Sequence, residues 1–174
     1  NIPHDANLII YSTAYNENNP EVAAALAGKI KTITYAEALS EYFNQSHGIA
    51  VCGSHGKTTT TAWLGFVLDR AGLSPSVMVG ASVPQFSGAS LVGKSNYLVI
   101  EADEYQNKLA WFNPKIILLN NIDYDHPDFY PDHASYTSAF TNFVKKIPNG
   151  GFLVANFDDP LIRDISANQK TKII

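Results

Sequence analysis

The chain has 174 residues, of which 45% are hydrophobic and 16% are charged, and its formal net charge is −4. This length allows one medium domain, or one domain with part of another, and the composition excludes an intrinsically disordered chain. No basic patch stands out, which argues against a nucleic-acid partner, and no apolar run approaches the roughly 18 to 20 residues of a membrane span.

The cysteine content bears on the cellular compartment, and the first residue bears on whether the chain is part of a longer protein. Cys52 is the only cysteine, so no internal disulfide can form, which fits a reducing cytoplasm. No signal peptide is visible. The chain begins at Asn1 and its only methionine is Met78. We therefore expect a piece of a longer cytoplasmic protein.

The first part of the chain alternates between strand and helix patterns. We predict strands at residues 7–11 and 30–33 and helices at 20–27 and 35–43. The strand at 7–11 is expected to be buried, because it is a continuous apolar run. Asn19 and Pro20 are typical of a helix cap and a first helical position. The polar stretch 44–48 predicts a domain boundary, which gives domains at 1–46 and 47–174.

The second part repeats a strand–helix pattern more regularly. Strands are predicted at 49–52, 76–79, 97–100, 116–119, 152–155 and from 172, and helices at 58–71, 133–146 and from Pro160. Residues 84–93 are rich in Ser, Gly and Pro and predict a loop. Continuous apolar strands that alternate with helices indicate an α/β fold, a mostly parallel sheet with helices on both faces.

Residues 53–58 read Gly-Ser-His-Gly-Lys-Thr between a predicted strand and a predicted helix. Glycines let backbone N–H groups turn toward phosphate oxygens, and a helix N-terminus favours an anion. Lys57 would stabilise the β- and γ-phosphates, and the Thr58 hydroxyl would bind Mg²⁺. The predicted ATP-binding residues are Gly53, Ser54, His55, Gly56, Lys57, Thr58 and Thr59. The usual P-loop spacing needs a glycine at 51, where this chain has Val51.

Polar residues also follow two later strands, and ligands of open α/β sheets bind beyond the carboxyl ends of strands. Glu101 directly follows one strand, where a metal-linked carboxylate would lie; Asp103 and Glu104 are weaker candidates. His126 lies among carboxylates after the next strand, which favours a second metal site. Cys52 is expected to be buried packing without a nucleophilic role, because no activating base can be assigned to it.

Four motifs in matching order and spacing resemble the Mur ligases of peptidoglycan synthesis. They are residues 53–61, Glu101-Ala102-Asp103-Glu104, residues 121–126 and Asn156-Phe157-Asp158-Asp159-Pro160. The upstream Ser12-Thr13-Ala14 resembles the end of their Rossmann-like UDP-binding domain, so the fold is expected to be a P-loop ATPase-like domain preceded by a Rossmann-like tail. Among the branches of the family, the one that adds L-alanine to UDP-N-acetylmuramate is the most similar, and the branch that reattaches a murein tripeptide is the near alternative.

The resemblance implies an ATP-dependent amide ligase that forms an acyl phosphate on its sugar substrate. Lys57, Glu101 and His126 are the implied catalytic residues. Thr58 is the implied ligand of a first Mg²⁺ ion, and Glu101 and His126 are the implied ligands of a second. Ser12, Thr13 and Asn121 are the implied contacts with UDP-N-acetylmuramate. Family members are two to three times the length of this chain, so these 174 residues alone are expected not to ligate.

Three other interpretations stay open at this point. A folate polyglutamate ligase shares the chemistry, but the UDP-domain-like segment counts against it. A P-loop switch or partitioning ATPase usually has Asp at the second acidic strand and no His after the next strand, whereas Glu101 and His126 occupy those positions. A non-catalytic fragment is the third interpretation.

Overall fold

The structure, a computed structural model, describes residues 2–174. The chain forms two compact units, Asn1–Tyr42 and Phe43–Ile174. The division falls inside α2 (Tyr35–Gln45), slightly before the polar stretch at 44–48. What each unit binds stays a prediction.

The first unit is a parallel strand–helix–strand unit. Its strands β1 (Leu8–Tyr11) and β2 (Lys31–Thr34) pair in parallel, and α1 (Pro20–Ala27) connects them. The Asn19 side chain caps α1 as predicted, because it accepts from the N–H groups of residues 21 and 22 at 2.9 and 3.3 Å. The expectation of a buried strand at 7–11 is wrong, since Leu8 and Ile10 are 38% and 50% exposed. A two-stranded sheet with one helix cannot cover both of its faces.

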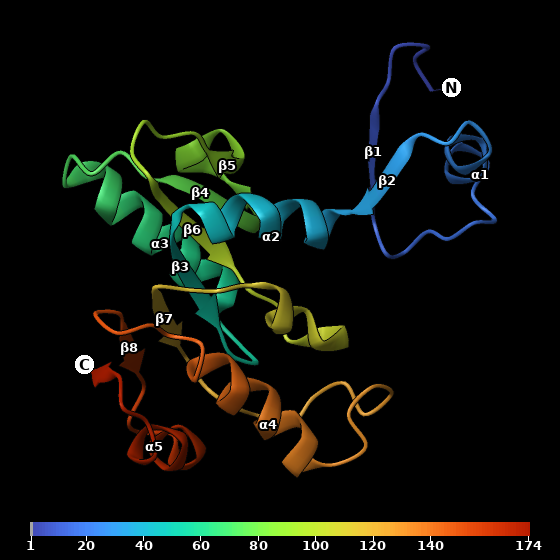
Figure 1. The fold of residues 1–174 in the computed structure, drawn as a ribbon. Coiled ribbons are helices and arrows are strands. Elements are labelled where there is room, and N and C mark those ends of the chain that lie inside the picture. The colour runs from blue at the N-terminus through green and yellow to red at the C-terminus, as the bar shows by residue number, and fades with distance from the viewer. Residues whose placement is uncertain (1) are drawn as a thin grey trace. The chain divides into compact units, whose positions relative to one another are not determined.

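The second unit is built on a seven-stranded sheet with the order β5-β4-β6-β3-β7-β8-β9 (Figure 1). Its strands are β3 (His47–Cys52), β4 (Ser76–Val83), β5 (Gly88–Leu91), β6 (Tyr97–Glu101), β7 (Ile116–Leu119), β8 (Phe152–Ala155) and β9 (Lys172–Ile173). Its helices are α3 (Lys57–Arg70), α4 (His133–Val144) and α5 (Pro160–Ala167), with 3-10 segments η1 (Pro84–Phe86) and η2 (Tyr105–Trp111). All pairs are parallel except β4 with β5.

The loop predicted at 84–93 contains a strand, so that prediction is wrong. β5 pairs antiparallel with β4, with Val77 opposite Leu91 and Met78 opposite Ser90. The sequence Gly-Ala-Ser-Leu has little β-propensity. The strand forms because the neighbouring edge of β4 offers backbone hydrogen bonds, which no local pattern reveals.

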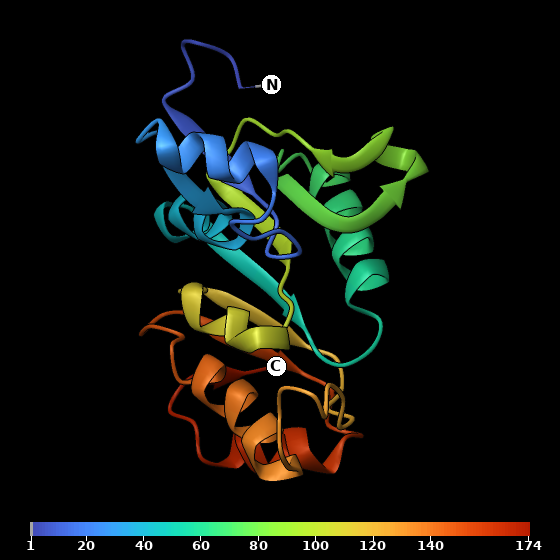
Figure 2. The same ribbon diagram turned by 90° about the vertical axis from the view of Figure 1, so that its right-hand side faces the viewer.

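Both faces of this sheet are covered. Ile49, Val51 and Val99 form a buried cluster on one face, against which Leu64 and Leu68 of α3 pack. Successive strand residues point to opposite faces, and the residues between them, Ala50, Leu98 and Ile100 among others, are also buried. Figure 2 shows α3 in green beside the β4–β5 hairpin and α4 and α5 in orange and red at the β7–β8 end. The predicted α/β fold with a mostly parallel sheet is confirmed.

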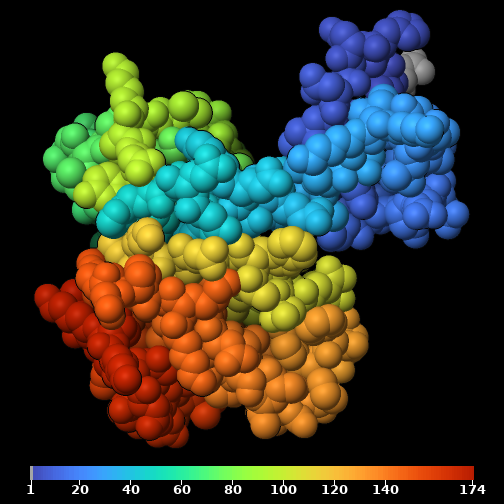
Figure 3. Space-filling view, viewed as in Figure 1, coloured from blue at the N-terminus to red at the C-terminus, as the bar shows by residue number. Residues whose placement is uncertain are grey.

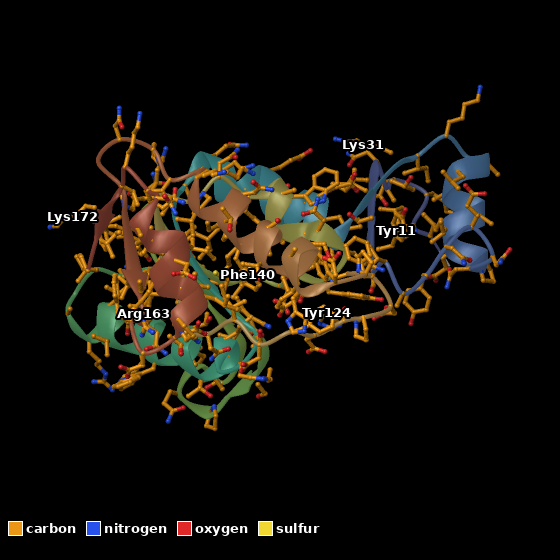
Figure 4. All side chains as sticks on the ribbon, turned by 90° about the horizontal axis from the view of Figure 1, so that it is seen from below. Tyr11, Lys31, Tyr124, Phe140, Arg163 and Lys172 are labelled. Atoms are coloured by element: carbon orange, nitrogen blue, oxygen red, sulfur yellow. The ribbon has the colours of Figure 1, made fainter. Side chains whose placement is uncertain are left out.

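The helix α4 supplies much of the remaining core. Tyr136, Phe140 and Phe143 are each at most 1% exposed, and Figure 4 shows Phe140 inside this unit, whereas Arg163 and Lys172 lie at its periphery. In the space-filling view α4 and α5 lie side by side at one end of the unit (Figure 3).

The strand order places a switch point between β3 and β7. From β3 the chain passes through α3 to β4 on one side, and from β7 through α4 to β8 on the other side. At such a point the connections from the two strands run in opposite directions along the sheet and leave a crevice beyond the strand ends. The loops after Cys52 and Leu119 meet there.

Candidate functional site

The predicted phosphate loop lies between β3 and α3. Val51 is fully buried in β3 and paired with both Glu101 and Leu118, so the strand extends past the position where a longer loop would have its first glycine. The loop is therefore short and begins at Gly53. Gly53 has φ 129°, and a Cβ there would lie 2.9 Å from the Asn121 carbonyl oxygen. Only glycine fits that conformation and that contact.

Asn121, which follows β7, holds this loop in place. Its Oδ1 accepts from His55 N at 2.8 Å and its Nδ2 donates to His55 O at 3.1 Å. Its backbone oxygen accepts from Ser54 N at 3.1 Å. The loop is thus fixed before any ligand arrives. The predicted contact of Asn121 with substrate stays a prediction, and both polar ends of its side chain are engaged by the loop.

The N-terminus of α3 faces the loop without a side-chain cap. Gly56 is the N-cap residue, in the left-handed conformation with φ 76°. The first N–H groups of a helix have no partner within the helix and carry a partial positive charge. This 14-residue helix therefore presents uncapped donors where the sequence predicts phosphate.

Lys57 lies at the start of α3, and its ammonium group turns back to the loop. Its Nζ donates to Gly53 O at 2.7 Å and to Ser54 O at 3.3 Å. It also pairs with Glu104 Oε2 at 3.2 Å. The Lys57 side chain is 14% exposed, so this positive charge lies mostly inside the protein.

Thr58 and Glu101 form a second contact between α3 and the sheet. The Thr58 hydroxyl donates to Glu101 Oε1 at 3.1 Å, and Gly80 N donates to Glu101 Oε2 at 2.8 Å. A hydroxyl and a carboxylate at one point are oxygen ligands of the kind that Mg²⁺ prefers. The two predicted ligands therefore do lie together.

His126 lies beside the carboxylate of Glu104, whereas the predicted metal site pairs it with Glu101. Its Nε2 lies 3.7 Å from Glu104 Oε1 and 3.8 Å from Asp125 Oδ2. No hydrogen bond or ion pair joins it to Glu101 within residues 2–174. Asp103, Glu104 and His126 offer ligand atoms within 4.8 Å of one another. The structure thus separates a Thr58–Glu101 pair from a Glu104–His126 pair.

The orientation of His126 is set by its backbone and by a neighbouring ring. Its φ is 57°, in the left-handed region that residues other than glycine seldom occupy. The Tyr105 ring lies 4.5 Å from the His126 ring between centroids, and the Tyr105 hydroxyl donates to Asp128 Oδ2 at 2.7 Å. The Tyr105 hydroxyl is therefore held by Asp128 while its ring packs on the imidazole.

The other predicted site residues have separate positions. Thr59 is exposed on the first turn of α3, and His55 is exposed with its Nε2 3.5 Å from Asp123 Oδ2. Ser12 and Thr13 lie in the first unit, just after β1 and exposed, where Ser12 Oγ accepts from Ala14 N at 3.2 Å. Their predicted contact with substrate stays a prediction.

Two residues with weak sequence signals are central to the site. Glu104 is fully buried, although it was a weaker candidate than Glu101. The Tyr136 hydroxyl bonds to Glu104 Oε1 at 3.2 Å and shares a 2.7 Å hydrogen bond with Ser54 Oγ. Tyr136 fits the apolar stripe of α4, so its sequence context carries no signal of this polar contact. The acidic run after β6 was the available signal for Glu104.

Cys52 precedes the loop as buried strand packing, as expected. Burial raises the pKa of its thiol far above the usual range, and the nearby Glu104 charge adds to this effect. A thiol held neutral is a poor nucleophile.

A cavity of about 550 Å³ adjoins the loop on its β7–β8 side. Asn120, Asn121 and Asn156 line it together with His55 and Thr60. Asn120 Nδ2 donates to Thr60 Oγ1 at 3.1 Å, so one of these amides also braces α3.

Comparison with known proteins assigns the family. Residues 51–174 match the model of the Mur ligase middle domain, and residues 1–47 match that of the Mur ligase family, catalytic domain. The chain belongs to the Mur ligase family. The phosphate loop, Glu101 and His126 all lie within the middle-domain match.

Curated Mur ligase relatives match nearly the whole chain. A UDP-N-acetylmuramate–L-alanine ligase of Caldicellulosiruptor bescii is 41% identical over 98% of this chain. An enzyme of the same name from Aquifex aeolicus is 36% identical over 98% of the chain. The chain spans 38% and 37% of the length of these two relatives.

Solved Mur ligase structures share the fold. The UDP-N-acetylmuramate:L-alanyl-gamma-D-glutamyl-meso-diaminopimelate ligase from Neisseria meningitides superposes with a TM-score of 0.82 at 27% identity, over 96% of this chain and 57% of that chain. The UDP-N-acetylmuramate-alanine ligase from Thermotoga maritima gives 0.77 at 26% identity, over 94% and 40% of the two chains.

Proposed function

We propose that a polypeptide containing this chain is an ATP-dependent ligase that joins L-alanine to UDP-N-acetylmuramate. The observation that carries this proposal is the 41% identity, over 98% of the chain, to a relative with that name. UDP-N-acetylmuramate and L-alanine are then its substrates, and the cytoplasm its compartment. No helix within residues 2–174 has the length and apolar character needed to cross a membrane.

The geometry of the loop supports ATP as the nucleotide. The uncapped start of α3 can accept an anion, and Gly53 and Gly56 both have the positive φ values that such a loop needs. The Lys57 ammonium group turns back to the same loop, where its positive charge can stabilise the transferring phosphoryl group.

The side chains around the loop also support Mg²⁺. Thr58 and Glu101 supply oxygen ligands 3.1 Å apart. We propose that Thr58 binds a first Mg²⁺ ion and that Glu101 and His126 bind a second. The Glu104 carboxylate lies 3.7 Å from His126 Nε2. A bound Mg²⁺ ion would neutralise charge that develops on the phosphates.

In the proposed reaction the lactyl carboxylate of the sugar attacks the γ-phosphorus of ATP, and ADP leaves. The resulting acyl phosphate is attacked at its carbonyl carbon by the L-alanine amine, which loses a proton as phosphate leaves. The chain's contribution is to position the phosphates and to stabilise their charge. Lys57 and the N–H groups of α3 perform both tasks.

A second candidate is the ligase that attaches a murein tripeptide to the same sugar. The TM-score of 0.82 with the enzyme from Neisseria meningitides favours it, because the corresponding value for the L-alanine ligase from Thermotoga maritima is 0.77. The identities of 41% and 36% to the curated L-alanine ligases favour L-alanine as the acceptor. The family match counts against a folate polyglutamate ligase and against a switch ATPase.

The test is an assay of the chain within a polypeptide of the relatives' full length. With ATP, Mg²⁺ and UDP-N-acetylmuramate, we expect phosphate release that depends on L-alanine and a product whose mass equals the sugar plus one alanine. Lys57→Met should abolish both signals. Release that depends on the tripeptide alone would select the second candidate, and release with neither acceptor would refute both.

A further inference from the structure

The Glu104 carboxylate is a buried group without a role in the proposed mechanism beyond its proximity to His126. Its side chain is 1% exposed, and three different elements surround it. Oε2 accepts from Lys57 Nζ of α3 at 3.2 Å, and Oε1 accepts from the Tyr136 hydroxyl of α4 at 3.2 Å. His126 Nε2, from the loop after β7, lies 3.7 Å from Oε1.

A buried carboxylate needs a compensating charge, and Lys57 supplies it. A lysine ammonium has three donors. In this structure Gly53 O, Ser54 O and Glu104 Oε2 accept from Lys57 Nζ. All three donors therefore have partners inside the protein. A phosphate oxygen can bind Lys57 only if it replaces one of these partners.

Glu104 is the partner that a phosphate would replace. The two carbonyls belong to the loop backbone, which Asn121 fixes through His55 and Ser54. Glu104 is the anionic partner of Lys57, so a second anion on the same ammonium would repel it. After losing Lys57, Glu104 would still keep the Tyr136 hydroxyl and its place beside His126.

We propose that Glu104 is a positioning residue that competes with the nucleotide for Lys57. It holds the ammonium at the loop before the nucleotide binds and releases it to the phosphates afterwards. This inference depends on the nucleotide binding of the proposed function but not on ligase activity. It concerns the free energy of ATP binding, which is measured separately from ligation.

The test is a double-mutant cycle on ATP affinity, measured by calorimetry with Mg²⁺. Glu104→Gln keeps the size of the side chain and removes the competing charge, so the Kd for ATP should fall by about threefold to tenfold. In a Lys57→Met background the same change should alter Kd by less than about twofold. Asp69→Asn, on the exposed end of α3, removes one negative charge as a matched control and should leave Kd unchanged.

Structural damage would weaken binding, so the expected tightening separates the two roles. Weaker binding by a folded Glu104→Gln variant would overturn the proposal. Equal tightening in the Lys57→Met background would show a through-space charge effect and would overturn it as well. Absence of ATP binding by the unmodified chain would do the same, whereas loss of ligation with intact binding would refute only the proposed function.

A crystal structure of the unmodified chain with a non-hydrolysable ATP analogue gives a second test that does not depend on the folding of a variant. We expect Lys57 Nζ to bond to a phosphate oxygen and to lie beyond the 4 Å limit of an ion pair from Glu104. A Lys57 that keeps its contact with Glu104 while it binds phosphate would contradict the proposal.

Discussion

The side-chain amide of Asn121 clamps the backbone of His55 at both of its polar groups, with His55 N at 2.8 Å from Oδ1 and His55 O at 3.1 Å from Nδ2. These residues are 66 positions apart in sequence. The clamp joins the end of β7 to the loop after β3. It therefore fixes the shape of the phosphate loop from outside the loop.

Asn121→Ala is expected to weaken ATP binding by about tenfold, because two hydrogen bonds of about 1 kcal/mol each no longer order the loop. Calorimetric titration of the 174-residue chain measures the change. Asn149→Ala at an exposed turn is the matched control. An unchanged Kd in Asn121→Ala would show that the loop holds its shape without the clamp.

Gly53→Ala is expected to destabilise the second unit by about 1–3 kcal/mol, since the positive φ is strained for alanine. The new methyl group would also lie 2.9 Å from Asn121 O. Urea unfolding measures the loss. Gly88→Ala, where a Cβ meets nothing within 4 Å, is the control. Equal stability of the two variants would contradict the close packing of the loop.

Thr58→Ala and Glu101→Gln are each expected to reduce the Mg²⁺-dependent part of ATP affinity by about tenfold, because each removes one proposed oxygen ligand. Binding is compared with Mg²⁺ and with EDTA. Thr58→Ser keeps a hydroxyl and should retain most of the affinity. If EDTA affects the variants as strongly as it affects the unmodified chain, Thr58 and Glu101 do not hold the ion.

Asp159→Ala is expected to cost about 1–2 kcal/mol in the free energy of unfolding, as the loss of a helix cap does. Asp159 Oδ1 accepts from the first N–H groups of α5, at 2.8 Å from Leu161 N, and Oδ2 accepts from Ile122 N at 2.8 Å. Thermal melting compares it with Asp158→Ala, an exposed neighbour. A larger loss of stability in Asp158→Ala would contradict the assignment of the cap to Asp159.

Cys52 is expected to react with a thiol reagent only after unfolding, even at pH 9. Burial raises the pKa of this thiol above its ordinary value. The thiolate therefore forms in the unfolded chain near pH 8.5 but not in the folded one, and stability falls as the pH rises past that value. The reaction rate with and without urea at pH 7 and pH 9 measures this. Rapid labelling of the folded chain at pH 9 would contradict the burial.

Much of the fold follows from local sequence patterns. Asn19 and Asp159 each precede a proline, and both cap the helices predicted for them. The apolar runs that became β3, β6 and β7 are continuous because both faces of the sheet are covered. β5 was missed because its residues have weak strand propensity and its partner strand supplies the hydrogen bonds.

The candidate site also has features that local sequence predicts and features that it does not. The sequence of residues 53–58 by itself predicted the order of strand, loop and helix at the proposed phosphate loop, because the glycines, Lys57 and the helix start are neighbours in the chain. Only the tertiary structure decided which acid meets which partner. Thr58 meets Glu101 across 43 positions and Lys57 meets Glu104 across 47, since strand order in the sheet sets these distances and no local pattern encodes it.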